Sequence, residues 1–407
     1  MSDNDRRRLL REVSHSGMCS HPVRLTGEVV NLATGEVVPR QLKVACKDRR
    51  QSVCPACADR YETDAWIIVA AGMRGGKGVP DSVAGAPRVF VTVTAPSFGA
   101  VHRTNDRGAC VVRNRLDESC PHGLPRWCSV RHRTTDLEVG RPLCDECFDA
   151  RNVILWNAHA SRLWSVTVQD ARRNLASTAG ISRTDLGEVA QLHYVKVAEL
   201  QRRGLVHFHA LFRFDTQSPG EGSDVGDVVW ALQKAILTAT LREGDGIYRW
   251  GTVFDVQDLG GSLGDTRGVA SYLAKYVTKT AGGSIELASR FRSRREIMLR
   301  VGDPLLQRLA LEAWDMGLER SANTLGYAGQ FITKSRGYST SFGELRAART
   351  AYWMSEPDAD EVQATYAYSG RGYDDPRASD LADVMARLER ERRIQARREL
   401  KERRGDS

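Results

Sequence analysis

The sequence predicts an α+β fold in which helices pack on an antiparallel sheet. Residues 88–94 alternate apolar and β-branched side chains with a period of two, which is typical of a strand. Residues 193–214 contain two such stretches around a short turn, which indicates a β-hairpin. Residues 225–243 and 266–280 have apolar spacing that is typical of helices. Strands mixed with helices that cover one face favour an antiparallel α+β sandwich.

Two further elements complete the predicted order of strand, insertion, helix, hairpin, helix, strand and helix. A helix is expected at about 151–176, after the insertion, and a strand at 250–259. The first strand ends before Pro96, and the Gly- and Pro-rich segment 72–87 that precedes it is expected to be a loop or linker. We expect a Cys-rich N-terminal module, a central domain with an insertion at about 105–150, an extension and a charged helical tail, at residues 1–70, 86–285, 286–350 and 351–407.

The bulk composition narrows the class of protein. The 407 residues are 41% hydrophobic, which is enough for a buried core, and the net charge of +8 is compatible with a polyanionic partner. No apolar run approaches the roughly 18 residues of a membrane span, and the first residues lack a secretory signal. The GGKG at 75–78 lacks the spacing of a phosphate-binding loop, which excludes an NTPase. We expect a cytoplasmic protein without a membrane partner.

The first group of cysteines predicts a zinc site. The nine cysteines are an odd number, so they cannot all pair as internal disulfides. Cys46, Cys54 and Cys57 have the spacing C-x7-C-x2-C, and Cys19 lies upstream. Four thiolates would close a tetrahedral structural zinc site. His21 is an alternative fourth ligand, and free buried cysteines are the alternative to a metal.

The insertion holds the other five cysteines and predicts a second zinc site. Cys144 and Cys147 form the pair C-D-E-C, whose thiolates can reach one ion from a tight turn. We favour Cys120 and Cys128 as the other ligands and leave Cys110 unassigned. In a long segment with few apolar residues, the metal would replace the missing core. The sequence therefore predicts one or two structural Zn²⁺ ions.

Two histidines interrupt the apolar strand near residue 208. His207 and His209 are two apart and therefore face the same side of the sheet. If residues 202–204 form a three-residue loop with Gly204 in the left-handed region, Glu199 lies opposite His207. Two nitrogens and one carboxylate with open positions suit Mg²⁺ or Mn²⁺ bound to a phosphate. The alternative is a pair of buried histidines that only form hydrogen bonds.

The helix at 266–280 carries a second candidate group. Tyr272 and Tyr276 are four apart and lie on one helical face, and Lys275 and Lys279 have the same spacing beside them. A phenol with a pKa near 10 is a poor nucleophile unless a cation or base helps to deprotonate it. Tyrosines at this spacing often only pack. Together with an acid-His-His patch, however, they favour phosphotyrosine chemistry.

Three segments resemble motifs of the HUH endonucleases. The HFH at 207–209 is similar to their His-hydrophobic-His motif, and LAKYVTK at 273–279 resembles their nucleophile motif. VFVTVTAPS at 89–97 resembles the first motif of rolling-circle replication initiators, and the three occur in that family's order. With CPACADRYETDAW, VAELQRRGLVHFHAL and TKSRGYST, the resemblance extends over about residues 45–350 to actinobacterial plasmid replication initiators of the RepSA type.

The resemblance implies an HUH-type sheet and a site-specific single-strand DNA endonuclease that starts rolling-circle replication. It implies His207, His209 and Glu199 as ligands of a catalytic divalent ion. Tyr276 would attack the DNA and form a 5′-phosphotyrosine, whereas Tyr272 matches the first tyrosine of relatives that use two. Whether Tyr272 takes part stays open.

The resemblance also implies partners and supporting residues. Lys275 and Lys279 would stabilise the phenolate or hold the phosphate. Lys334 and Arg336, in TKSRGYST, suit contacts with the DNA backbone, and an ordinary sheet edge is the alternative. The partners would be origin DNA, single-stranded or in a hairpin at the nick, and host helicase and polymerase. The rival functions are an HUH relaxase or transposase and a zinc-containing DNA-binding regulator that has lost catalysis.

Overall fold

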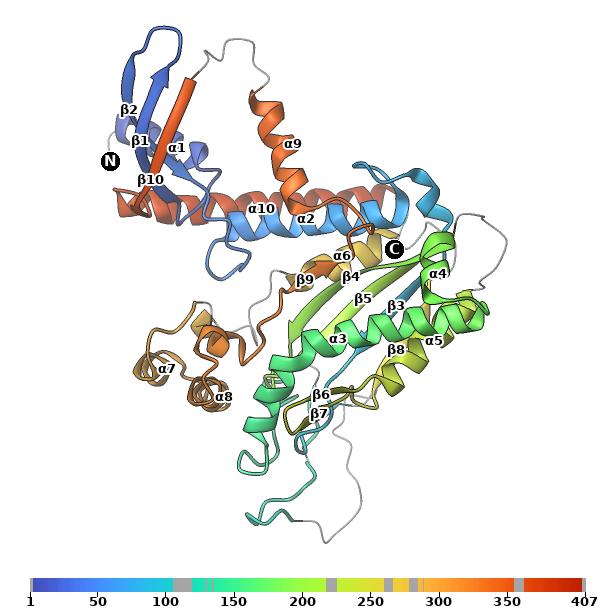
Figure 1. The fold of residues 1–407 in the computed structure, drawn as a ribbon. Coiled ribbons are helices and arrows are strands. Elements are labelled where there is room, and N and C mark those ends of the chain that lie inside the picture. Colours follow the sequence, from blue (N-terminus) through green and yellow to red (C-terminus); the bar gives the residue numbers. More distant parts are fainter. Residues whose placement is uncertain are drawn as a thin grey trace. The chain divides into compact units, whose positions relative to one another are not determined.

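The chain forms two compact units, each with its own sheet (Figure 1). One unit comprises residues 69–339, and the other combines both ends of the chain, residues 1–68 and 340–407. In the described part of the chain, no helix combines the length and apolar character that a membrane span needs. The computed structural model describes residues 3–404 except 105–118, 129, 134, 217–224, 260–265, 278–284, 288 and 355–361.

The unit of residues 69–339 is built on a five-stranded sheet of order β8-β3-β5-β4-β9, in which all neighbours are antiparallel. The predicted combination of an antiparallel sheet with helices is confirmed. The expected helix at 225–243 is shorter, because its last residues form a strand instead. The strands are β3 (Arg88–Val93), β4 (Ala190–Leu200), β5 (Val206–Thr216), β8 (Phe254–Asp258) and β9 (Ile332–Lys334).

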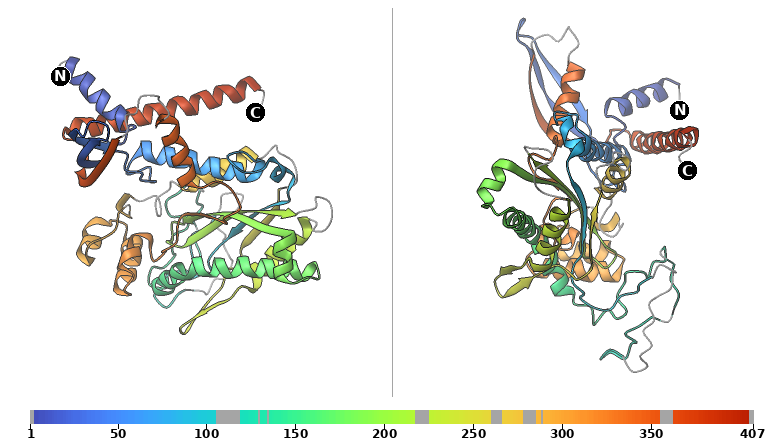
Figure 2. Two further views of the ribbon diagram at one scale, coloured as in Figure 1. Left: turned by 45° about the horizontal axis from the view of Figure 1, so that its top comes forward. Right: turned by 90° about the vertical axis from the view of Figure 1, so that its right-hand side faces the viewer.

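One face of this sheet is apolar and packs on helices α3 (Ala150–Thr178) and α5 (Val225–Thr238). Phe208 and Phe212 point to this face, and the ring of Trp164 from α3 lies 5.9 Å and 5.6 Å from theirs. Figure 2 shows α3 running along the sheet. Because side chains alternate between the faces of a strand, the neighbouring residues His207 and His209 must face the opposite side.

Asn157 is a polar residue on the buried side of α3, and it fixes the start of β5. Its side chain is fully buried and donates to the carbonyl oxygens of Gly204 and Leu325, both at 2.8 Å. Its Oδ1 atom accepts from the backbone N–H of Val206 at 2.9 Å. Three backbone groups near the hairpin turn are thus satisfied by one side chain.

The opposite face of the sheet carries the polar side chains of His207, His209 and Arg213 between apolar ones, and it is partly covered by α6 (Thr266–Val277), which packs against β4. The last residues of α2 (Pro55–Arg74) also reach this face, since Arg88 of β3 donates to the carbonyl oxygen of Met73 at 3.3 Å. The other elements of this unit are η1 (Asp81–Gly85), α4 (Arg183–Val189), β6 (Leu241–Glu243), β7 (Gly246–Tyr248), η4 (Ile285–Leu287), α7 (Arg294–Arg300), α8 (Pro304–Asp315) and η5 (Glu319–Thr324).

The unit that combines both chain ends has a three-stranded antiparallel sheet of order β10-β1-β2. Helix α1 lies beside α10, where Leu9 and Val13 pack on Ala378 and Ala382 (Figure 2). The charged tail forms α10, and its Arg393 pairs with Asp59 of α2. The elements are α1 (Asp3–His15), β1 (Val23–Asn31), β2 (Val37–Val44), α9 (Phe342–Met354), β10 (Val362–Arg371) and α10 (Pro376–Arg404).

Candidate functional site

The β4–β5 hairpin brings Glu199 opposite His207, as the sequence predicted. Gln201 donates its backbone N–H to the carbonyl oxygen of Leu205 at 2.9 Å, which closes the turn. Gly204 has a φ of +80°, the left-handed conformation that this loop requires. The predicted register is confirmed.

His209 lies at the centre of the polar patch. Its Nε2 atom is 3.7 Å from a carboxylate oxygen of Glu199, and its Nδ1 atom is 3.2 Å from the hydroxyl of Thr92. The ring of His207 lies 4.5 Å from that of His209. Only 6% of the His209 side chain is exposed, against 22% for Glu199, so the carboxylate forms the open side of the patch.

His207 lies beside His209 on the same strand face, and its ring is mostly buried. Its Nδ1 atom is buried and has no hydrogen-bond partner among the described residues. Burial, with a smaller effect of His209, lowers the pKa of His207 to about 3, so the ring is neutral at pH 7, the form that binds metals. The three donors of Glu199, His207 and His209 do not all lie within 4.8 Å of one another. A bound ion would therefore draw them together.

Tyr272 of α6 lies directly against this patch. Its ring meets that of His209 edge-on at 5.2 Å and that of Phe90 at 5.8 Å, and 41% of the residue is exposed. Tyr276 follows one turn later in the same helix. Of the two predicted tyrosines, Tyr272 is therefore the one whose ring contact with the histidines is described.

The other predicted residues of this helix are described less fully. The backbones of Lys275 and Tyr276 belong to α6, but their side chains lie outside the described part of the chain. Lys279 falls in residues 278–284, which also lie outside it. Tyr276, Lys275 and Lys279 therefore stay predictions as site residues.

Arg203 lies in the hairpin turn and was expected only as part of the loop at residues 202–204. Its guanidinium is largely buried, which lowers its pKa, and Arg103 adds to this effect. Its positive charge also acts on His207 and disfavours the charged form of that ring. The signal in the sequence was the pair of arginines, Arg202 and Arg203, five and four residues before His207.

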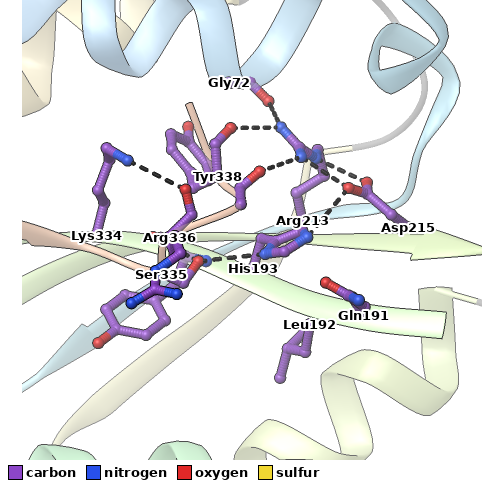
Figure 3. A network of polar contacts seen from close by, with 12 residues as sticks. Gly72, Gln191, Leu192, His193, Arg213, Asp215, Lys334, Ser335, Arg336 and Tyr338 are labelled. Atoms are coloured by element: carbon purple, nitrogen blue, oxygen red, sulfur yellow. Dashed lines mark hydrogen bonds and ion pairs between the residues drawn. The ribbon is translucent and has the colours of Figure 1, made fainter. Parts of the chain in front are cut away.

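Lys334 and Arg336 lie at the edge of the same sheet (Figure 3). Lys334 pairs with Val195 and thus shares a face with Glu199, and its Nζ donates to the carbonyl oxygen of Arg336 at 3.4 Å. Arg336 is exposed. Lys334 is partly exposed, so both basic side chains reach solvent at this edge of the sheet.

The rest of TKSRGYST is structural (Figure 3). Tyr338 is fully buried, burial raises the pKa of its phenol, and its hydroxyl donates to the carbonyl oxygen of Val69 at 3.1 Å. Arg213 of β5 stacks on this ring, donates to the carbonyl oxygens of Tyr338 and Gly72, and forms two 2.7 Å hydrogen bonds with Asp215. This network holds the segment on the sheet, and the sequence alone gave no sign of Arg213.

The first predicted cysteine group comes together. Cys19, Cys46, Cys54 and Cys57 have all their sulfurs within 4.8 Å of one another, with Sγ–Sγ distances of 3.6 Å for Cys46–Cys57 and 3.8 Å for Cys54–Cys19. Two thiolates on one tetrahedral zinc would be about 3.8 Å apart, so the cluster fits this ion. The alternative ligand His21 is exposed, and its Nδ1 is 3.0 Å from the hydroxyl of Ser20.

The second group forms with a different partner from the one we expected. Cys120, Cys144 and Cys147 gather with His122, whose Nδ1 lies 3.5 Å and 3.3 Å from the last two sulfurs. Cys128 is not in this cluster and lies with His102 and His132. Cys110 falls outside the described residues. The ligand set cannot be chosen from spacing alone, because histidines of the insertion compete with its cysteines.

Comparisons with known proteins agree with these motifs. Residues 5–387 match a family described as "Replication initiator protein, pSAM2". A replication initiator protein of Streptomyces ambofaciens is 34% identical over 420 residues, covering 91% of this chain and 86% of that protein. No solved structure matches. The chain therefore belongs to the RepSA family of replication initiator proteins.

Proposed function

We propose that the protein starts rolling-circle replication by nicking one strand of origin DNA with a tyrosine. The observation that carries this proposal is the patch of Glu199, His207 and His209 on one face of the sheet, with Tyr272 against His209. Membership of a replication initiator family supplies the DNA substrate.

Glu199, His207 and His209 would hold Mg²⁺ or Mn²⁺, which when bound polarises the scissile phosphate and stabilises negative charge. The buried nitrogen of His207, without a described partner, supports this ligand set. The Glu199 carboxylate is partly exposed, which supports access of DNA to this face of the sheet.

The phenolic oxygen of Tyr276 attacks the phosphorus in line. The phenol gives up its proton as the bond between them forms, the bond from phosphorus to the 3′ oxygen breaks, and that oxygen takes up a proton, so no net proton is gained or lost. The products are a 5′-phosphotyrosine and a 3′-hydroxyl that a polymerase can extend. Because the phosphodiester energy is kept in the new bond, a later strand transfer needs no nucleotide cofactor. Tyr272 is a second nucleophile for that transfer, and Lys275 and Lys279 stabilise the phenolates.

DNA contacts and structural metals complete the proposal. Lys334 and Arg336, at the edge of the sheet, hold backbone phosphates. The two clusters of four ligands, around Cys54 and around Cys144, each bind a structural zinc ion, which fits their donor sets. Host helicase and polymerase act on the nicked origin afterwards.

The test is cleavage of a labelled single-stranded origin oligonucleotide with Mn²⁺ or Mg²⁺, read as a covalent protein–DNA adduct on a denaturing gel. We expect the adduct to vanish with EDTA, with His207→Ala and with Tyr276→Phe. Tyr272→Phe should keep the first adduct and lose strand transfer. Tyr194 lies in the same sheet, but on the face that packs on α3. Tyr194→Phe is therefore the control and should behave as wild type.

Two other outcomes would change the assignment. An adduct that survives Tyr276→Phe but not Tyr272→Phe would move the nucleophile one helical turn. Specific origin binding with no adduct under either metal would contradict the nuclease and support a DNA-binding regulator. Cleavage of transfer-origin or transposon-end DNA in preference to the replication origin would instead support a relaxase or a transposase.

A further inference from the structure

The insertion buries metal-binding side chains where a domain would normally bury apolar ones. Among its described residues between 119 and 147, the buried ones are Pro142 and four candidate ligands. The apolar side chains of Leu124, Val130 and Leu137 are 44%, 57% and 77% exposed. This segment therefore lacks a hydrophobic core of its own, and something else must stabilise it. The four buried ligands are Cys120, Cys128, His132 and Cys144.

A single zinc ion does not account for these residues. The cluster of Cys120 and Cys144 is complete with two other ligands, yet Cys128 and His132 are buried away from it. They form a separate group with His102, in which the three donor atoms lie within 4.8 Å of one another. We propose that His102, Cys128 and His132 bind a third metal ion of the zinc class.

The geometry of this group suits such an ion. The Nδ1 of His102 lies 3.0 Å from the Nε2 of His132, which is 3.2 Å from the sulfur of Cys128. Two imidazoles on one tetrahedral zinc would have nitrogens about 3.3 Å apart, so only a small expansion is needed. The rings are almost perpendicular, at 88°, so they meet at an edge and do not stack. One thiolate with two imidazoles favours zinc over Mg²⁺ or Ca²⁺.

The surroundings orient the two histidines for this role. The far nitrogen of His132, Nδ1, lies 3.7 Å from a carboxylate oxygen of Asp136, and that oxygen accepts from the backbone N–H of Arg133 at 2.8 Å. A carboxylate behind a histidine is the usual support of a metal ligand. His102 is held through its backbone, which donates to Arg141 and accepts from Gly140, both at 2.9 Å.

The ion would also fix the insertion to the hairpin of the polar patch. Arg202, in the turn between β4 and β5, donates to the carbonyl oxygens of Asp136 and Val139. These carbonyls belong to the loop that follows His132. Metal binding at this site would stabilise the structure of the insertion and is independent of DNA nicking.

The test counts metal ions on the full-length protein by native mass spectrometry after growth with zinc. We expect three ions on the wild type, and two on Cys128→Ser, His132→Asn and Cys144→Ser. The double variant Cys128→Ser/Cys144→Ser should lose two ions, because the sites are separate. His15→Asn, which changes an exposed histidine of α1, is the matched control and should keep all three.

A ligand exchange separates metal binding from misfolding. His132→Cys supplies a thiolate at the same place, so it should keep the third ion that His132→Asn loses. In cadmium-loaded protein, the NMR resonance of this site should then move toward those of the thiolate-rich sites. An ion count that stays the same in wild type, Cys128→Ser and His132→Asn would overturn the proposal and leave a hydrogen-bonded His-His-Cys group.

Discussion

Lys196 lies on the face of the sheet that packs on α3 and α5, where burying a charge costs free energy of folding. It is 2% exposed, its Nζ lies 3.8 Å from the ring centre of Phe208, and it donates to the hydroxyl of Tyr327 at 3.4 Å. Burial lowers the pKa of Lys196 to about 7. Aromatic rings offset part of the cost of burying the cation, but within the described residues no carboxylate forms an ion pair with it.

The shifted pKa predicts that stability depends on pH. Between about pH 7 and 10.5 the unfolded state binds a proton at Lys196 that the folded state lacks, so the free energy of unfolding should rise with pH by up to about 1.4 kcal/mol per unit. Lys196→Met should remove this slope and raise stability most at the lower pH. Urea unfolding at pH 7 and 9.5 checks this, and equal slopes for both proteins would contradict it.

At the scale of elements, the β4–β5 hairpin could be predicted because its information is local. The loop length, Gly204 and the strand alternation together fix which residues face each other. Partners that depend on the path of the whole chain could not be predicted in this way. The grouping of Cys128 with His102 is one example, and the pairing of β9 with β4 is another.

The conformation and surroundings of Gly204 predict that a larger residue at this position destabilises the hairpin. A residue with a Cβ atom would be strained at the φ of +80°. Its Cβ would also lie 2.3 Å from Cδ1 of Leu309. Gly180 has a φ of +68° but no atom within 4 Å of such a Cβ, so it is a matched control. Gly204→Ala should cost about 1–3 kcal/mol more than Gly180→Ala, since it adds overpacking to the strain. Equal losses in thermal unfolding would show that Leu309 moves freely.

At the scale of the molecule, one compact unit combines the two ends of the chain. Strand β10 pairs with β1 along its whole length, and the hydroxyl of Tyr373, just after β10, donates to the carbonyl oxygen of Cys19 at 2.7 Å. We expected the cysteine-rich module and the tail to be separate regions, so this pairing was not predicted. Contacts between segments so far apart in sequence leave no local pattern.

This arrangement predicts the effect of removing the tail. Deletion of residues 362–407 should abolish the protection of β1 amides from hydrogen exchange, because half of their ladder is lost and Leu9 and Val13 become exposed. The β4–β5 amides, whose partners all lie elsewhere, should keep their protection. Deletion of residues 396–407 alone leaves β10 intact and is the control. Protected β1 amides in the longer deletion would refute the pairing.

Strand β10 is synthesised long after β1, which affects how the N-terminal sheet forms during translation. β1 ends at Asn31 and β10 begins at Val362, so about 330 residues, or roughly 15 to 65 s of translation, separate the two partners. During that time the β1–β2 hairpin offers an unpaired edge to other chains. A ribosome that stops early releases a product with this edge still open. Only completed chains can close it.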